Sequence, residues 1–413
     1  MEVVIAPSLS GDDYLTVFKR HIVKRTQIIL TRVQQDGAVL PAKTLKQALH
    51  ILEYSLKLPE AWPDTRALLL TMAPKMEQAG YRDEWIPYLR QGIHQSQQLR
   101  DEETEAELHI QLGILFQLRG NYEVARSHLE ASVKAFASVG NSHGQARALN
   151  QLAFVAQRQR QFDEAVDFVQ RALQLSAEDD AEQAFSYFVL GMVALERREW
   201  LEAVDLFQRA SNIWEQKKDR RMVGRTLTLL GSALHRMNRN TEAIEIYERA
   251  ITLLEQANDP VHKAMAQMNL GNAYIVLSRL EEALESHLRA EEVFRNVQDR
   301  LHLAHVTHNI GIIYRRLQQW HKAENAYRVS MRLWEQLNNV ERLVNTTDGL
   351  GLVYFEQGHF TKAEATFEDA LKQLRRIEGE PGYDHKFNMV MSHLKETREV
   401  IAQQQERFVN EQV

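Results

Sequence analysis

Small residues recur along this chain at a nearly constant spacing, and each is followed by an alanine twelve residues later. Successive members of the first set are 40, 38, 40, 40, 40 and 40 residues apart. On two antiparallel helices, such a pair lets the backbones approach closely where the helices cross. A fixed period of this length predicts an array of helix pairs, each packed against the next. The first set is Gly113, Ala153, Gly191, Gly231, Gly271, Gly311 and Gly351, and its partners are Ala125, Ala165, Ala203, Ala243, Ala283, Ala323 and Ala363.

Aromatic and alanine positions extend this pattern. Tyr274, Tyr314 and Tyr354 follow their glycines by three residues. Further matches are Phe207, Tyr247, Tyr327 and Phe367, and the later alanines Ala172, Ala210, Ala250, Ala290 and Ala370. The pattern resembles the tetratricopeptide repeat family over about residues 64–378. That resemblance implies an all-α, right-handed superhelical solenoid of antiparallel helix pairs.

Two features depart from the usual family pattern. The period is mostly 40 residues rather than 34, and the closing proline is absent apart from Pro260. The longer period resembles the subset found in Leu-Gly-Asn-type scaffolds, in sensor domains of signalling ATPases and in Rap-type peptide-sensing regulators. The resemblance is specific for the fold and says little about a ligand.

The repeat pattern divides the chain into four parts. They are an N-terminal helical segment (1–62), a degenerate first repeat (63–102), seven repeats (103–378), and a linker with a C-terminal capping helix (379–413). In the degenerate repeat, Pro74 and Pro87 are expected to interrupt the helices.

The N-terminal segment is expected to begin with an amphipathic helix that ends near Gln35. Its apolar side chains recur at helical spacing, and its polar face is basic. That basic face is either an ordinary solvated surface or a docking surface for an acidic partner. The apolar residues are Leu15, Phe18, Ile22, Ile29 and Val33, and the basic ones are Lys19, Arg20, Lys24, Arg25 and Arg32.

Composition excludes several classes of function. The 413 residues contain no cysteine, which excludes disulfides, thiolate catalysis and cysteine-based metal sites, and suits a reducing cytoplasm. The net charge of −6 gives no general attraction to nucleic acid or to an anionic membrane. No apolar run approaches the ~20 residues of a membrane-spanning helix. The N-terminus also lacks the basic start and long apolar core of a signal peptide. We therefore expect a cytoplasmic protein.

Catalytic and metal-binding motifs are also missing from the sequence. There is no phosphate-binding loop, no dinucleotide fingerprint and no serine nucleophile elbow. His302, His305 and His308 lie three residues apart, but the outer two diverge by about 120° on a helix. We therefore expect these residues to be ordinary surface or groove histidines and not metal ligands. We predict no enzyme activity, no cofactor and no metal.

A candidate binding surface follows from the resemblance, because first helices line the concave face in this family. By register, the residues expected there are polar and tend to be basic in the middle of the array. Asparagine side chains could pair with a peptide backbone, and arginines with carboxylates. A wet inner surface without a ligand would look the same in sequence. The residues are Arg147, Asn150, Arg158, Arg225, Arg236, Asn269, Asn272, His305, His308, Asn309, Arg315, Arg316 and Asn345.

These observations favour a non-catalytic intracellular adaptor that binds a protein or peptide, with an acidic segment, in the concave groove. The alternative is a peptide-sensing signalling regulator of Rap type, whose N-terminal helices act on a second protein. An enzyme accessory or a phosphatase is a third interpretation. Nucleic-acid binding is the weakest, because of the net charge and the lack of aromatic stacking residues beside the groove arginines. The sequence specifies neither the partner nor the oligomeric state.

Overall fold

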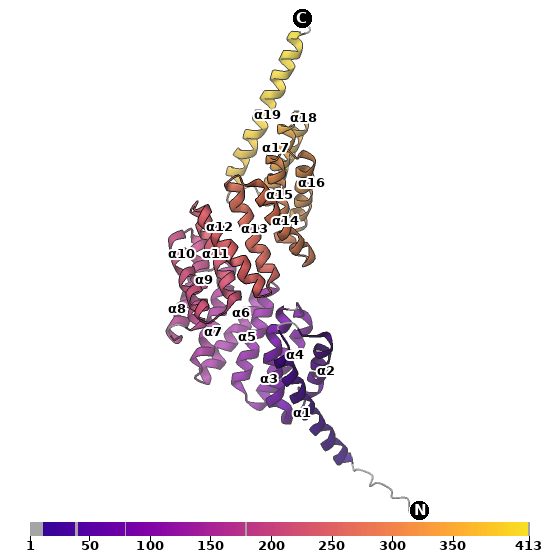
Figure 1. The fold of residues 1–413 in the computed structure, drawn as a ribbon, viewed down its shortest axis with the longest axis vertical. Coiled ribbons are helices and arrows are strands. Elements are labelled where there is room, and N and C mark those ends of the chain that lie inside the picture. Colours follow the sequence, from indigo (N-terminus) through magenta and orange to yellow (C-terminus); the bar gives the residue numbers. More distant parts are fainter. Residues whose placement is uncertain (1–10, 38–39, 79, 178–179, 412–413) are drawn as a thin grey trace, which may run out of the picture. The chain divides into compact units, whose positions relative to one another are not determined.

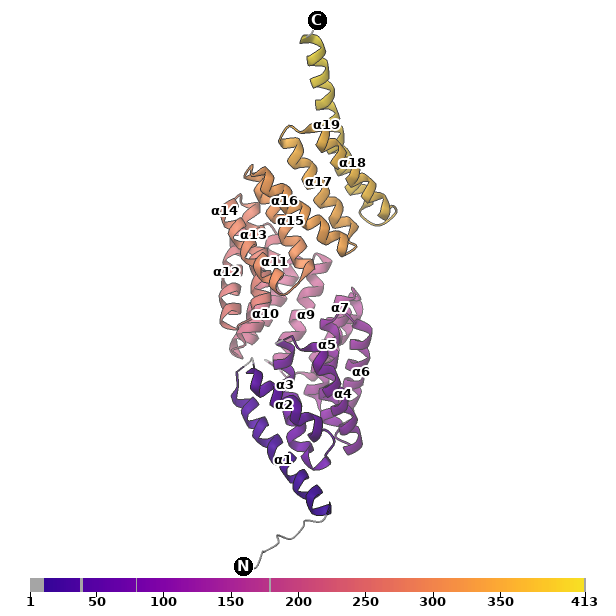
Figure 2. The ribbon, with the colours of Figure 1, turned by 90° about the vertical axis from the view of Figure 1, so that its right-hand side faces the viewer.

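The computed structural model describes residues 11–37, 40–78, 80–177 and 180–411. Those residues form helices and their connections, and none of them lies in a β-strand. The chain divides after Arg197 into two compact units, called unit 1 (through Arg197) and unit 2 (from Arg198) below. In each unit, helices that follow one another in sequence pack side by side (Figures 1 and 2). The all-α prediction is confirmed.

Unit 1 begins with a helical segment and continues with helix pairs. The segment is α1 (Gly11–Gln35), α2 (Ala42–Ser55) and a 3₁₀ turn (Pro59–Ala61). The pairs are α3 (Trp62–Gln78) with α4 (Arg82–Leu99), α5 (Glu102–Leu118) with α6 (Tyr122–Ser138), and α7 (Ser142–Arg158) with α8 (Phe162–Leu175). The unit ends with α9 (Ala181–Arg197), which packs on α7 and α8.

Unit 2 starts with α10 (Trp200–Gln216) and continues with four pairs and a last long helix. The pairs are α11 (Arg220–Arg236) with α12 (Asn240–Gln256), α13 (Pro260–Val276) with α14 (Leu280–Asn296), α15 (Arg300–Arg316) with α16 (Trp320–Gln336), and α17 (Val340–Glu356) with α18 (Phe360–Leu374). A 3₁₀ turn (Arg375–Ile377) leads to α19 (Tyr383–Glu411).

The links between helices follow a regular local pattern. In the link after α13, Ser278 has a left-handed φ of 59°. The next N–H, from Arg279, donates to the carbonyl of Tyr274 at 2.9 Å. This bond satisfies a carbonyl that the helix end would leave unpaired. A capping side chain often follows, as where Asp299 accepts from the N–H of His302 at 3.0 Å. Left-handed residues recur in the helix links at 198, 218, 238, 258, 278, 298, 318, 338 and 358 of unit 2.

The helix crossings use the glycines that the repeat pattern singles out. A Cβ built on Gly311 would lie 2.8 Å from the ring of Tyr327, and one on Gly351 would lie 2.4 Å from the ring of Phe367. Such distances leave no room for a side chain, so the second helix packs directly on the backbone of the first. The alanine partner of Gly311, Ala323, is fully buried. The predicted role of the small residues at these crossings is therefore confirmed.

The last helix, α19, occupies the position of a first helix. Met391 stands 40 residues after Gly351, and α19 packs on both α17 and α18. Val390 and Leu394 are buried against that surface, whereas Phe387 is 38% exposed. One apolar side and one wet side are what a solenoid cap requires. In both ribbon views the C-terminal end of α19 extends past α18 (Figures 1 and 2).

The expected interruptions at Pro74 and Pro87 are wrong. Pro74 lies inside α3 and Pro87 inside α4, and both helices are continuous. Each proline removes one backbone hydrogen bond, but its neighbours are deeply buried. Met72 and Trp85, two residues before the prolines, are both 0% exposed. Packing of these apolar faces offsets the local loss, because most helical stability in proteins comes from tertiary packing.

Candidate functional site

The predicted binding residues of unit 2 lie on its first helices, α11, α13, α15 and α17. Each of these helices contacts the next one, and α17 contacts α19. Among the described residues, successive second helices do not approach one another to the same extent. The more closely spaced layer is the inner side of a curved row. We call it the first-helix layer of unit 2.

Polar side chains of this layer bond across neighbouring repeats. The Asn309 amide donates to the Asn272 carbonyl oxygen at 2.7 Å. Nδ1 of His308 lies 3.0 Å from the hydroxyl of Thr346. The Asn345 carbonyl oxygen accepts from Nζ of Lys386 at 2.9 Å, which ties α17 to α19. The structure therefore places these predicted side chains close together, but they already have hydrogen-bond partners within the chain.

A second link in the layer reaches into a helix crossing. The Asn269 amide donates to the Ser232 hydroxyl at 3.2 Å, which joins α13 to α11. The Tyr247 hydroxyl, from the buried side of α12, donates to the same oxygen at 3.3 Å. Through Ser232, the layer is thus continuous with the packing beneath it.

The arginines of the layer are partly neutralised by acids from adjacent repeats. Arg315 forms an ion pair with Glu356 of the next first helix. Nε of Arg225 lies 3.4 Å from a carboxylate oxygen of Asp259. Arg316 is exposed and donates to the carbonyl of Ile275 at 2.7 Å. An acidic ligand would have to share or replace some of these contacts.

Asp259 is the most strongly perturbed acid of this layer. Burial acts to raise its pKa, but the hydrogen bond and charge of His262 and the guanidinium groups of Arg221 and Arg225 lower it well below its usual range overall. The side chain also accepts from the N–H of His262 as the cap of α13. This carboxylate therefore stays ionised and anchors the arginines around it.

The three predicted histidines of α15 have separate partners. His302 bonds Asp299 at 2.7 Å, and the ring of His305 packs edge-on against Trp334 at 4.7 Å between centroids. Burial lowers the pKa values of His305 and His308 to about 4, so both are neutral at pH 7. No group of three potential metal ligands occurs among the described residues.

In unit 1 the predicted residues have different surroundings. Arg147 pairs with Glu107, and Arg158 is exposed. Asn150 is fully buried. Its amide donates to the carbonyl of Glu182 at 2.8 Å, and its own oxygen accepts from Ser186 at 2.7 Å. Asn150 thus joins α7 to α9 and is not open to a ligand in this structure.

Sequence reasoning missed an aromatic cluster in unit 1. The rings of Phe154 on α7 and Phe185 on α9 lie 6.2 Å apart, and Phe185 lies 5.9 Å from Phe188. Phe154 occupies the inward register position one residue after Ala153, so the same count that selected Asn150 could have found it.

A second missed surface lies on the N-terminal half of α1. The expected buried stripe is buried only in its later part: Ile29 and Val33 are 0% exposed, but Leu15 is 54% and Phe18 is 46% exposed. The Phe18 ring packs edge-on against Tyr54 of α2, with centroids 6.1 Å apart. In both ribbon views this end of α1 extends beyond α2 and α3 (Figures 1 and 2).

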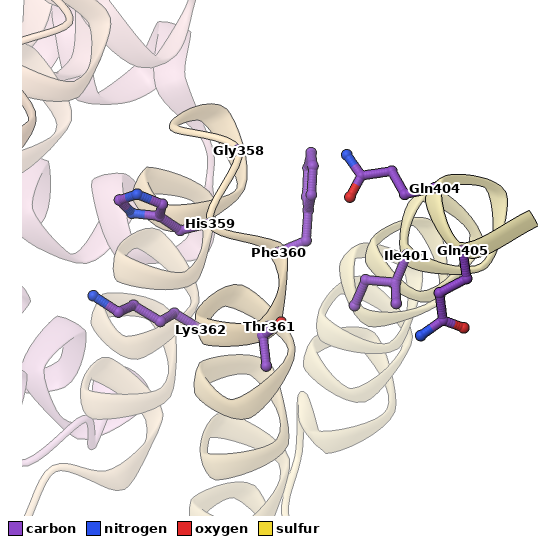
Figure 3. A pocket seen from close by; sticks show the side chains of 8 residues that line it. All are labelled: Gly358, His359, Phe360, Thr361, Lys362, Ile401, Gln404 and Gln405. Carbon is purple, nitrogen blue, oxygen red and sulfur yellow. The ribbon is translucent and has the colours of Figure 1, made fainter. Parts of the chain in front are cut away.

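A large pocket of about 810 Å³ lies away from the first-helix layer, between the start of α18 and the far end of α19. Figure 3 shows Phe360 and Ile401 facing the gap between the two helices, with Gln404 beside them. This pocket exists because α19 is longer than the other first helices and continues past the point where they end. None of the predicted binding residues lines it.

Two kinds of comparison relate the chain to known proteins. A family model described as tetratricopeptide repeat matches residues 104–178, 180–256, 262–336 and 303–376. No curated protein matches the sequence at a significant level. None of the described helices has the length and apolar character needed to cross a bilayer.

Several solved structures share the fold. A tetratricopeptide-repeat signal transduction ATPase from Pyrococcus horikoshii is 13% identical, covering 95% of this chain and 68% of its own, with a TM-score of 0.59. A Rap protein complexed with competence and sporulation factor is 14% identical over 93% and 99% of the two chains, with a TM-score of 0.55. Aspartyl phosphate phosphatase F from Bacillus subtilis is 14% identical over 89% and 96%, with a TM-score of 0.53. At these identities the likeness concerns the fold.

Proposed function

Because this chain belongs to the tetratricopeptide repeat family, we propose that it is a non-catalytic adaptor that binds a protein or peptide on the first-helix layer of unit 2. The observation that carries this proposal is the amide pair of Asn272 and Asn309, which joins two first helices at 2.7 Å. Both side chains are only partly buried. Amides can exchange such a bond for one to a peptide backbone at little net cost, because each offers both a donor and an acceptor.

An acidic segment in the partner is the second part of the proposal. Arg236 and Arg316 are exposed, and Arg315 and Arg225 are partly exposed, with side chains 21% and 24% accessible. Guanidinium groups bind carboxylates by charge-assisted hydrogen bonds. Because Arg315 already pairs with Glu356, a ligand carboxylate would replace an existing acid at that position. Such an exchange would contribute more to selectivity for the geometry of the ligand than to its affinity.

The test is a charge reversal on one layer only. A partner is first identified by capture from the native host, and its affinity for purified protein is measured by isothermal titration. The double change Arg315→Glu and Arg316→Glu should weaken binding by tenfold or more and reduce the loss of affinity that salt causes, while the melting temperature changes little. The matched control is Arg289→Glu with Arg295→Glu, which makes the same charge change on the second helix α14. Equal loss in both variants, or no loss in the first, contradicts the proposal.

The second candidate function is a peptide-sensing regulator whose N-terminal helices act on another protein. The exposed apolar end of α1 favours it, because Tyr14, Leu15, Val17 and Phe18 are all at least 46% exposed. Clustered exposed apolar side chains of this kind usually mark an interaction site. One fold neighbour of this chain is a Rap protein bound to competence and sporulation factor, which motivates the peptide-sensing part.

Introducing charge on the exposed apolar end of α1 separates the two candidates. Leu15→Glu with Phe18→Glu should abolish binding of a partner that docks on α1 and should leave a partner of the first-helix layer unaffected. The control is Val297→Glu with Leu301→Glu, two apolar residues of similar exposure, 47% and 46%, in unit 2. If every captured partner tolerates the α1 variant, the regulator candidate fails. A cytoplasmic location stays a prediction, which microscopy of the tagged native protein would check.

A further inference from the structure

The last helix, α19, is joined to the rest of unit 2 by an unusually long link. Three residues (337–339) connect α16 to α17, whereas eight residues (375–382), the 3₁₀ turn included, connect α18 to α19. Gly379 and Gly382 have left-handed φ values of 85° and 91°, and a Cβ built on either one would meet nothing within 4 Å. Glycines in such an open link let the backbone turn at little cost. This link can therefore act as a hinge.

Few apolar side chains hold α19 in place. In the part of this helix whose side chains are described (383–407), only Val390 and Leu394 are both apolar and buried. The 17 residues of α17 include six buried apolar side chains. Because burial of apolar surface is the main favourable term in helix packing, the docking of α19 depends more on polar contacts than the packing of α17 does.

Three basic side chains of α19 make these polar contacts with α17 and α18. They are Lys386 with Asn345 (2.9 Å) and Glu341 (3.2 Å), His393 with Asp348 (2.8 Å), and Arg398 with Glu364 (2.7 Å) and Glu368 (2.6 Å). Of these three residue types, only histidine ordinarily changes its charge near neutral pH. The contact of His393 is therefore the one that proton concentration can adjust.

The surroundings of His393 favour its charged form. Its partner Asp348 has a side chain that is only 6% exposed. The hydrogen bond from His393 to Asp348 raises the pKa of the imidazole, and the charges of Asp348 and Glu396 act in the same direction. Burial and the charge of Arg315, on α15, act to lower this pKa but are outweighed. The docked helix thus holds a proton on His393 more firmly than a free helix would.

This difference makes docking depend on pH. In the undocked helix His393 has the ordinary pKa of about 6.5, and in the docked helix its pKa is higher. The stabilisation is therefore complete below about pH 6.5 and is lost as the pH rises through the raised value. His305 and His308 act in the opposite sense, because burial lowers their pKa values and protonation weakens their packing.

We propose that α19 is a hinged cap whose docking on α17 and α18 is strengthened by protonation of His393, so that the cap opens more often as the pH rises through neutrality. Opening removes α19 from Asp348 and from Asn345, which belongs to the first-helix layer of unit 2. The end of that layer is thereby uncovered in a pH-dependent way. The device needs no binding partner and can be tested on the protein alone.

Hydrogen exchange of the full-length protein measures how often the cap opens. The exchange rates of amides 387–397 are divided by those of an unstructured peptide at the same pH, which gives a protection factor. Between about pH 6 and about pH 8.5 this factor should fall about fivefold, the ratio that separates a charged from a neutral hydrogen bond. The amides of α11, which belongs to an earlier repeat, should show no such fall.

Two variants remove the titration and one serves as the matched control. His393→Asn keeps an amide donor near the position of Nδ1 but cannot gain a proton, so its protection factors should be independent of pH. Asp348→Asn keeps an acceptor and removes the charge that holds the proton, so it should reduce the fall as well. His385→Asn makes the same change at an exposed position of α19 and should retain the whole fall.

A flat profile in the wild type, a fall that persists in both His393→Asn and Asp348→Asn, or its loss in His385→Asn overturns the proposal. If α19 is unprotected at every pH in the first two variants, NMR titration of the His393 ring in the wild type decides instead. A midpoint above about 6.5 supports the proposal, and a midpoint at or below that value overturns it.

Discussion

The helix crossings at Gly231 and Gly271 have the same shape but different chemistry. A Cβ on Gly231 would lie 2.6 Å from the ring of Tyr247, and one on Gly271 would lie 2.7 Å from the ring of His287. The Tyr247 hydroxyl reaches Ser232. His287 is 0% exposed, and neither ring nitrogen has a partner. The repeat therefore fixes how closely two helices approach, while the polarity of the ring at the crossing can vary.

This difference makes the α13–α14 pair the weaker of the two. A neutral imidazole keeps one N–H and one acceptor nitrogen, and burying both without partners costs stability. Tyrosine at the same place buries a larger apolar surface and places its polar end at the first-helix layer. The two crossings thus form a natural pair for mutational comparison.

The largest expected effect on stability comes from replacing the glycine at either crossing. Gly231→Leu and Gly271→Leu should each lower the free energy of unfolding by about 3 kcal/mol, because the new side chain overlaps the ring of the second helix. Urea denaturation followed by circular dichroism measures it. Gly37→Leu is the control, since a Cβ there meets nothing within 4 Å. A small loss at 231 with a large one at 271 would show that the crossings do not share one geometry.

Removing the unpaired nitrogens of His287 should increase stability. His287→Phe retains a flat ring against Gly271 and eliminates both unsatisfied atoms, so the free energy of unfolding should rise by about 2 kcal/mol at pH 7. The same denaturation assay measures the gain. No gain would mean that the nitrogens of His287 are satisfied in solution, and the contrast with Tyr247 would disappear.

The pH dependence of stability should follow the same residue. Burial lowers the pKa of His287 to about 3, below the ordinary value of about 6.5. Between these values the unfolded chain binds a proton and the folded chain does not, so stability falls as the pH drops below 6.5. At pH 5 this residue should remove about 2 kcal/mol. His287→Phe should abolish this contribution to the loss of stability. An unchanged pH profile of stability in the variant would refute the prediction.

The smallest expected effect concerns the polar end of the tyrosine. Tyr247→Phe removes the hydroxyl that bonds Ser232 at 3.3 Å, and should cost about 1 kcal/mol. The Ser232 hydroxyl keeps its bond from Asn269, which limits the loss. A cost as large as that of the glycine variants would indicate that the link to the first-helix layer, and not ring packing, holds this crossing.

Much of the fold could be predicted because it depends on spacing. Gly311 and Ala323 mark a crossing in sequence and in structure, since only small residues permit that approach. His287 lies sixteen residues after Gly271, as Tyr327 does after Gly311, so its place could be predicted as well. Its lack of a partner could not, because a hydrogen-bond partner depends on side-chain reach in three dimensions.

The candidate site was less predictable for a similar reason. Register placed Asn272 and Asn309 on neighbouring first helices, and they do meet. It could not reveal that Glu356 neutralises Arg315, because that acid lies 41 residues away and the pairing depends on rotamers. Leu15 and Phe18 belong to the predicted apolar stripe on α1. Whether such a stripe is covered depends on where the neighbouring helices end in the tertiary structure, which its spacing does not show.

The left-handed residues that recur every twenty positions through unit 2 have a mechanical consequence. They keep the helices of the four complete pairs close to one length, so each pair stores nearly the same length of chain. Under tension, a repeat of 40 residues would release ~140 Å of extended chain, at ~3.5 Å per residue. Because each repeat is held chiefly by its neighbours, the unit would lengthen in steps of uniform size, and the order of the steps would report the strength of each crossing.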